Sequence, residues 1–301
     1  MTSDSNCAVE SSGLIEITGL SKTYRSKKLA LVEALKNLDL LIGKGEVFGF
    51  LGPNGAGKST TIKILTGQIR QTAGSAQLAG QTVSDYRCRR DLGYLPENPV
   101  FYDYLTATEY LAFVGRAFGM SDSVIRQRAG EVLGLLDLQH AAKRPMRGFS
   151  KGMVQRLGLA QTLIHDPQVF IFDEPMSGLD PVGRALVKQL IKDLKRQGKT
   201  VFFSTHITAD VEEICDRVGV IVQGQLRAVD KVSDIVIGDT DNYRLHVRHG
   251  DGSVIEEIVS RNMLKQKVVN AWADQGALEK VVPVGRNLED YFLDIVNNVN
   301  K

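Results

Sequence analysis

Short apolar runs recur through the middle of the chain and alternate with segments of helical periodicity. Strands are predicted over residues 46–51, 75–79, 91–95, 169–172, 200–204, 218–222 and 226–229. The continuous run Val169-Phe170-Ile171-Phe172 is typical of a strand buried on both faces, as in a parallel sheet. Helices are expected between these runs, over residues 61–65, 154–164, 181–196 and 208–215. The alternation therefore predicts an α/β fold.

Two regions depart from this alternation. Residues 14–17 and 38–42 alternate as strands do, and residues 29–36 between them can form a further strand, which predicts a small antiparallel sheet. Residues 103–138 instead carry two helical stripes of apolar side chains. We therefore expect a helical subdomain over roughly residues 98–165.

The two ends of the chain differ from its middle. Residues 1–12 are polar and lack the basic and apolar segments of a secretory signal, so a flexible tail is expected. A polar linker at 237–242 precedes a predicted hairpin with its turn at 249–252, a helical stripe, a short strand and a last amphipathic helix. The expected organisation is a tail at 1–12, a larger domain at 13–236 and a small α+β domain at 242–301.

Bulk composition narrows the function classes. The chain has 301 residues, 43% of them hydrophobic and 24% charged, which is ordinary for a globular protein. Lys and Arg number 37 against 35 Asp and Glu, so the net charge of +2 gives no general reason to bind nucleic acid or an anionic membrane. The three cysteines lack C-x-x-C spacing, which argues against a disulfide framework or a zinc site. No run of about 18 apolar residues is present, so any membrane role is expected to be peripheral.

The most specific motif follows the first buried strand. Eight residues fit the pattern G-x-x-x-x-G-K-[ST], namely Gly52, Pro53, Asn54, Gly55, Ala56, Gly57, Lys58 and Ser59, and Thr60 completes the nine-residue loop. Glycines let such a loop curl so that its backbone N–H groups and the following helix face phosphate oxygens. Lys58 is expected to reach the β- and γ-phosphates, and Ser59 to bind Mg²⁺. The motif predicts a nucleoside triphosphate site, and its place between strand and helix disfavours a merely flexible glycine turn.

Further polar residues follow two other predicted strands. Asp173 and Glu174 end the apolar run at 169–172, and His206 follows the strand at 200–204. Ligands bind at the carboxyl ends of strands in open α/β sheets, so these side chains are candidates for the same site. The alternative for the acids is a solvated strand end, which the presence of the Gly-rich loop disfavours, and a lone histidine is most often structural. Ser150 fits a helix N-cap, and Tyr24 fits a packed or surface aromatic.

In combination, these motifs resemble the nucleotide-binding subunit of ABC transporters over residues 14–229. Walker A is the loop at 52–60, and Walker B is Val169 to Asp173 with Glu174 behind it. The D-loop is Ser177-Gly178-Leu179-Asp180, and the switch histidine is His206. Together with Tyr24 at the position of the family's adenine-stacking aromatic, these are five motifs in the family's order, which is far more specific than any one of them.

The resemblance implies roles for these residues. Tyr24 falls at the aromatic that stacks on adenine, while Ser59 and Asp173 would hold Mg²⁺. Glu174 would polarise the attacking water and His206 would contact the γ-phosphate. In this family the signature helix of a second copy, here Ser150 and Gly152, caps the γ-phosphate, so a head-to-tail dimer around two ATP molecules is implied.

Two positions differ from the usual family pattern. The signature reads Phe149-Ser150-Lys151-Gly152-Met153, so Lys151 adds a cation beside the phosphate, and this variant is similar to an exporter branch of the family. Glu97 stands where a glutamine is usual in the Q-loop. We hypothesise that Glu97 keeps the metal-binding role, and Asn98 is the alternative after a shift of one residue.

The resemblance implies an ATP-hydrolysing subunit of an ABC exporter, on the cytoplasmic face of the membrane, with an integral permease as partner. The permease is expected to dock on the segment at 98–119, where Phe101, Tyr102 and Tyr104 either line the groove or pack in the core. A soluble ABC ATPase acting on ribosomes or DNA is the alternative, disfavoured by the single Walker A motif and by the absence of a long coiled-coil insertion.

Overall fold

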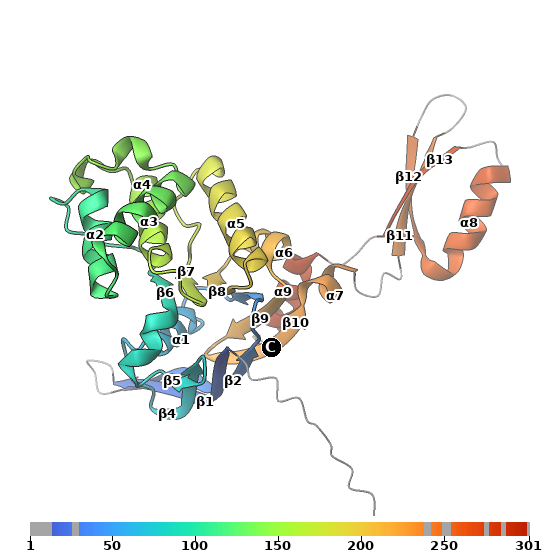
Figure 1. Cartoon of the computed structure of the whole chain (residues 1–301). Helices are drawn as coiled ribbons and strands as arrows, with labels where there is room; N and C mark the ends of the chain where they lie inside the picture. Colours follow the sequence, from blue (N-terminus) through green and yellow to red (C-terminus); the bar gives the residue numbers. More distant parts are fainter. Residues whose placement is uncertain are drawn as a thin grey trace, which may run out of the picture. The chain divides into compact units, whose positions relative to one another are not determined.

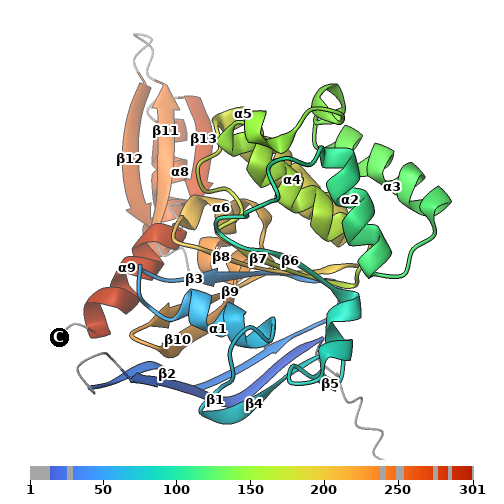
Figure 2. The same cartoon turned by 90° about the vertical axis from the view of Figure 1, so that its left-hand side faces the viewer.

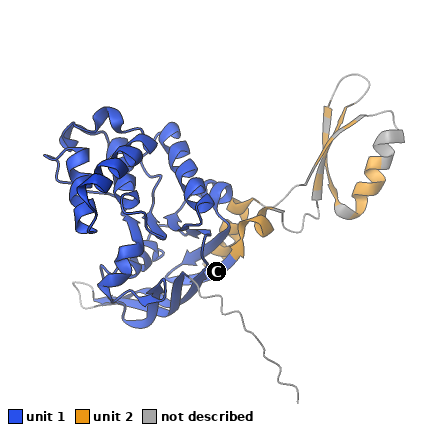
Figure 3. Ribbon diagram, viewed as in Figure 1, with its two compact units in different colours: residues 1–229 blue, residues 230–301 orange. Residues whose placement is uncertain are grey.

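The computed structural model describes residues 14–25, 30–237, 242–248, 254–273, 277–283 and 287–299. The predicted tail at 1–12 and the predicted turn at 249–252 lie outside these residues. The chain divides into two compact units, Met1–Val229 and Asp230–Lys301 (Figure 3). Among the described residues, no helix has the length and apolar character needed to cross a membrane.

The first unit contains two β-sheets and a set of α-helices (Figure 1). Its strands are β1 (Ile15–Arg25), β2 (Leu31–Ile42), β3 (Val47–Leu51), β4 (Ala73–Leu78), β5 (Gln81–Thr82), β6 (Leu92–Leu95), β7 (Val169–Asp173), β8 (Thr200–Thr205), β9 (Arg217–Val222) and β10 (Gln225–Lys231), which continues into the second unit. Its α-helices are α1 (Lys58–Leu65), α2 (Ala107–Ala117), α3 (Asp122–Leu135), α4 (Lys151–Leu163), α5 (Pro181–Arg196) and α6 (Thr208–Ile214).

The central sheet has six strands in the order β10-β9-β3-β8-β7-β6, and β6, β7, β8, β3 and β9 run parallel. Every residue of β3, β7 and β8 is buried, as the continuous apolar runs predict. Phe48 and Phe50 pack on one face with α1. Gly49 turns to the other face, where an added Cβ would lie 2.9 Å from Cys215 Sγ just after α6. Helices therefore cover both faces of the sheet.

An antiparallel sheet with the strand order β2-β1-β4-β5 packs on the side of α1 that faces away from the central sheet (Figure 2). The sequence suggested separate strands at 29–36 and 38–42, but β2 runs unbroken from Leu31 to Ile42. Asn37 accommodates the irregularity within the strand, with φ of 46° and its N–H bonded to Ser21 Oγ at 2.9 Å. Asparagine tolerates this left-handed conformation, so a bulge replaces the expected break.

Helices α2, α3 and α4 form the predicted helical subdomain beside β6. The start of α2 is fixed by a capping box, in which Thr106 and Glu109 each satisfy the other's backbone N–H. At the start of α4, Ser150 Oγ accepts a hydrogen bond from Met153 N at 3.3 Å. The signature segment is therefore held as a capped helix N-terminus.

The second unit contains α7 (Val232–Ile237), β11 (Asn242–Arg248), β12 (Val254–Ser260), α8 (Arg261–Ala273), β13 (Ala277–Pro283) and α9 (Leu288–Val299). Its strands form an antiparallel sheet in the order β12-β11-β13, and α8 packs on it. Asn287 caps α9 by accepting from Asp290 N at 2.7 Å, and Tyr291 donates to Asp230. The fold class predicted from the sequence is therefore confirmed, including the small α+β unit.

Candidate functional site

The Gly-rich loop connects β3 to α1 and has little freedom to vary. Gly57 adopts φ of 113°, and a Cβ there would lie 2.9 Å from the carbonyl oxygen of Ala34. A Cβ at Gly52 would lie 2.5 Å from the carbonyl oxygen of Ile221. Gly57 offers no side-chain cap, so the first N–H groups of α1 are available to an anion.

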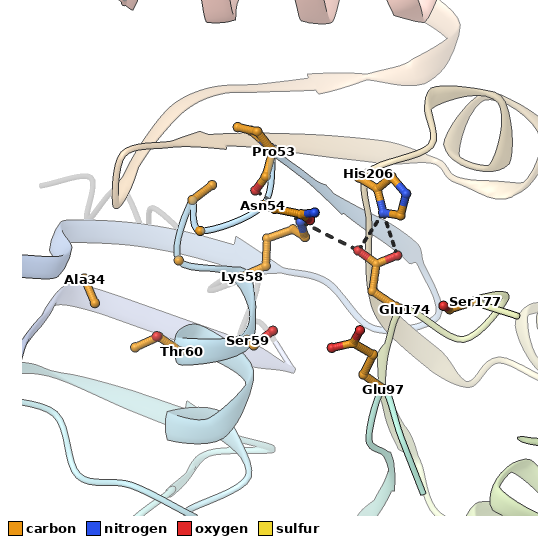
Figure 4. A pocket seen from close by; sticks show the side chains of 13 residues that line it. Ala34, Pro53, Asn54, Lys58, Ser59, Thr60, Glu97, Glu174, Ser177 and His206 are labelled. Carbon is orange, nitrogen blue, oxygen red and sulfur yellow. Dashed lines mark hydrogen bonds and ion pairs between the residues drawn. The ribbon is translucent and has the colours of Figure 1, made fainter.

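Lys58 is buried at the start of α1 and ties the loop together. Its Nζ donates to the carbonyl oxygens of Gly52 at 2.7 Å and Pro53 at 3.3 Å, and lies 3.6 Å from Glu174 Oε1. A cavity of about 410 Å³ opens beside it (Figure 4). The sequence-predicted residues that line this cavity are Pro53, Asn54, Gly55, Ala56, Gly57, Lys58, Ser59, Thr60, Glu97, Glu174 and His206.

Asp173 lies at the end of β7 and is 4% exposed. Its Oδ1 accepts a hydrogen bond from Ser204 Oγ at 2.6 Å, and Ser59 Oγ lies at the limit of hydrogen bonding, 3.5 Å away. Ser204 was not singled out from the sequence, because nothing in its own segment marks it. The pairing of β7 with β8 brings it opposite Asp173.

Glu174 has a strained backbone conformation that sets the direction of its side chain. Its φ is 50°, a conformation that L-residues adopt at a cost of about 1–2 kcal/mol. Its N–H lies 3.1 Å from Ser204 Oγ and 3.2 Å from the Ser204 carbonyl oxygen, which holds the turn in place. The carboxylate reaches His206 Nδ1, with the two oxygens 3.1 and 3.0 Å away (Figure 4). Lys58, Glu174 and His206 therefore form one connected group.

Glu97 lines the same cavity from the segment that follows β6. Figure 4 shows its carboxylate on the side of the cavity that faces Ser59 and Glu174. Hydroxyl and carboxylate oxygens are the donors that Mg²⁺ prefers, so Ser59, Asp173 and Glu97 fit a hard cation chemically. Within the described ranges no group of three or more His, Cys, Asp or Glu side chains forms a metal cage, so phosphate and water oxygens would have to complete the coordination.

Seven predicted residues are not among those that line this cavity, namely Tyr24, Gly52, Ser150, Lys151, Gly152, Asp173 and Asp180. Ser150, Lys151 and Gly152 begin α4, and the stem of Lys151 lies so close to the D-loop that a Cβ on Gly178 would be 2.6 Å from its Cε. Asp180 caps α5 by accepting from Gly183 N at 2.8 Å. In one copy of the chain, the signature and the D-loop are thus packed on each other.

Tyr24 also lies outside the residues that line the cavity. It pairs with Val32 in the antiparallel sheet, and Ala34, two residues further along β2, does line the cavity. The ammonium of Lys22 lies 5.1 Å from the centroid of the Tyr24 ring. The tyrosine is therefore a partly exposed aromatic, with a cation at its ring.

The comparisons with known proteins identify the family. The ABC transporter family matches residues 35–177. The chain is 40% identical over 300 residues to the ABC transporter ATP-binding protein sll0415 of Synechocystis sp., covering 93% of this chain and 84% of that protein. It is 38% identical over 218 residues to the bacitracin transport ATP-binding protein BcrA of Bacillus licheniformis, covering 71% and 69%.

A solved structure extends this likeness to the fold. The post-hydrolysis dimer of the ATP-binding cassette MJ0796, bound to ADP and Pi, superposes with a TM-score of 0.68 at 27% identity. The match covers 72% of this chain and 98% of that one. The Gly-rich loop, the buried strand ending in Asp173 and these relatives agree, and the chain belongs to the ATP-binding proteins of ABC transporters.

Proposed function

We propose that this chain hydrolyses ATP as the motor subunit of an ABC exporter, working as a dimer that closes on two ATP molecules and drives an integral membrane permease. The observation that carries the proposal is the group Lys58, Glu174 and His206, assembled on one cavity with the Gly-rich loop. A phosphate-binding lysine beside a carboxylate and an imidazole is suited to phosphoryl transfer to water.

Each side chain has a role in this proposal. Lys58 leaves the carbonyl oxygens of Gly52 and Pro53 to bind the β- and γ-phosphates. Ser59, Asp173 and Glu97 would hold Mg²⁺, which would neutralise phosphate charge when bound. Glu174 accepts the proton of the attacking water, and His206 orients that water and the γ-phosphate by hydrogen bonding. Tyr24 offers its ring to the adenine.

A second copy would complete the site. Ser150, Lys151 and Gly152 form a helix N-terminus that is not part of the cavity lining, so in this proposal they serve the ATP of the partner rather than their own. Gly178 and Leu179 of the D-loop lie against this segment, so the D-loop would move with it. The cassette MJ0796 is described as a dimer, which supports the same arrangement here.

A groove on the first unit suits the permease. A cavity of about 290 Å³ between α1, β6 and the helical subdomain is lined by apolar, aromatic and polar side chains, among them Arg89, Tyr94, Val114, Phe118, Gln161 and His165. The three aromatics expected at the docking face are not among the residues that line this cavity: Phe101 packs on Tyr110, with ring centroids 4.8 Å apart, while Tyr102 and Tyr104 are exposed. Exposed aromatic side chains such as Tyr102 and Tyr104 are enriched at docking faces, which supports a partner on this subdomain.

The relatives favour a transport role over the ribosome or DNA alternative, because those compared above are named as transporter ATP-binding proteins. The test is to tag the chain in its native host and purify it from detergent-solubilised membranes. We expect Mg²⁺-dependent ATPase activity and co-purification of a polytopic membrane protein. Recovery with ribosomes or DNA in place of a permease would refute the transport role, and absence of ATP turnover would refute the motor role.

A further inference from the structure

A row of ion pairs joins α5 to α6. Arg184 Nη2 donates to both carboxylate oxygens of Asp210, at 3.0 and 2.9 Å, and Lys188 Nζ lies 3.1 Å from Asp210 Oδ1. Further along the helices, Lys188 and Lys192 bind the two oxygens of Glu213, at 2.5 and 2.9 Å. The row starts with Arg184 and Asp210, near the N-termini of the two helices. It ends with the more exposed side chains of Lys192 and Glu213.

The two acids of this row differ in burial. The Asp210 side chain is 2% exposed, whereas that of Glu213 is 46% exposed. Exposed ion pairs contribute little, but a buried carboxylate depends on its partners because it has lost its water. Asp210 is therefore the firm link between α5 and α6, and Glu213 is a matched, weaker link on the same two helices.

The firm link lies between two catalytic loops. Helix α5 begins directly after the D-loop, where the Arg184 N–H is bonded to the Asp180 carbonyl oxygen at 2.9 Å. Helix α6 begins two residues after His206 and has no side-chain cap at Ile207. A helix of seven residues is not stable by itself, so its position is set by what it packs against.

We propose that Asp210 is a positioning residue that fixes His206 relative to the D-loop by holding α6 on the first turns of α5. The inference rests on the proposed function, in which His206 serves the γ-phosphate and the D-loop faces a second copy. A shift of the D-loop in the dimer would reach His206 through one buried carboxylate. Asp210 itself touches neither ATP nor water in the reaction.

Four single variants test this link. Asp210→Asn and Arg184→Gln break the firm link through Asp210. Glu213→Gln and Lys192→Gln break the weaker link through Glu213 and serve as matched controls. We expect kcat to fall about tenfold or more in the first two, because small misplacements of a catalytic group have effects of this size. KM for ATP stays close to that of the wild type, and the controls keep the wild-type kcat. The double variant Asp210→Asn/Arg184→Gln should be no slower than the worse single one, as residues of one link are not additive.

A second readout follows His206 directly in the nucleotide-free protein. The histidine imidazole NMR signals are compared among variants, with His206→Gln used to assign the signal. We expect the His206 signal to shift in Asp210→Asn and Arg184→Gln and to stay in place in Glu213→Gln. Folded Asp210→Asn and Arg184→Gln proteins with wild-type kcat and an unshifted His206 signal would overturn the proposal. Absence of turnover in the wild type would refute the proposed function alone, since the NMR comparison still decides the link.

Discussion

Ser204 Oγ donates a hydrogen bond of 2.6 Å to Asp173 Oδ1 in the interior of the sheet, where both side chains are nearly excluded from solvent. The same hydroxyl lies 3.1 Å from the backbone N–H of Glu174. One small side chain on β8 therefore orients the last residue of β7 and the first residue of the turn after it. The two acids of the site depend on a neighbouring strand for their geometry.

Replacing Ser204 with alanine should weaken both the fold and the activity. Asp173 would lose a short hydrogen bond in a buried place, which typically lowers the free energy of unfolding by about 1–3 kcal/mol. We expect a lower Tm and slower ATP turnover, measured by calorimetry and phosphate release. Ser123→Ala, on an exposed helix end, is the control and should change neither quantity. Wild-type stability and turnover in Ser204→Ala would show that Asp173 does not need this hydroxyl.

Glu174→Gln should separate ATP binding from hydrolysis. Glutamine keeps the size of the side chain but cannot accept the proton of water, so turnover should fall by about 10²–10⁴-fold. ATP should still bind, and the dimer should accumulate in the presence of ATP, as measured by size-exclusion chromatography. A variant that turns over ATP at the normal rate would exclude Glu174 as the base.

Glu97→Ala tests whether this acid takes the metal-binding role of the usual glutamine. Removing a carboxylate from the cavity should raise the Mg²⁺ concentration needed for half-maximal ATPase activity. It should also strengthen binding of ATP in the absence of Mg²⁺, because one negative charge near the phosphates is gone. The control is Glu131→Gln, which removes an exposed acid from α3. If Mg²⁺ dependence and transport are both unchanged in Glu97→Ala, the hypothesis is wrong.

Stability should depend on pH through His165. Burial lowers the pKa of His165 to about 4, from an ordinary value of 6.5. Its ring stacks on Phe118, with centroids 3.6 Å apart, and its Nδ1 is buried with no hydrogen-bond partner in the described part of the chain. Because the unfolded chain binds this proton more readily, stability is complete above pH 6.5 and is lost as the pH falls towards 4.

The measurement is Tm as a function of pH for the wild type and His165→Phe, which keeps an aromatic ring against Phe118. We expect the loss of Tm between pH 6.5 and 4 to be smaller in the variant. His140→Gln, at an exposed position, should follow the wild type. Identical curves for the wild type and His165→Phe would contradict the prediction.

Most of the first unit was predictable because its elements carry local signals. The helix predicted at 181–196 is observed as Pro181–Arg196, since Asp180 and Pro181 mark its start and the apolar stripe its length. β2 was predicted less well, because its bulge at Asn37 resembles a break between strands. A bulge is set by pairing with β1, which no short stretch of sequence records.

The candidate site divides in the same way. The loop at 52–60 can be recognised from the sequence alone, because its glycines and lysine have fixed spacing. Ser204 cannot be recognised in this way, because its position opposite Asp173 depends on the register between β7 and β8. Asp210 likewise looks like any acid near a helix start until α5 brings Arg184 and Lys188 to it. Contacts between distant segments are the part that motifs leave out.

The hydrogen bonds from Lys58 to Gly52 and Pro53 bear on how fast nucleotide can be captured. A loop that its own lysine already closes has lost its conformational freedom before any ligand arrives, so capture should require little ordering of the backbone. In the proposed function, Lys58 would exchange these two carbonyl oxygens for phosphate oxygens without becoming an unpaired buried charge. Nucleotide entry would then be an exchange of hydrogen-bond partners within a preformed loop, and release of phosphate would restore the original partners.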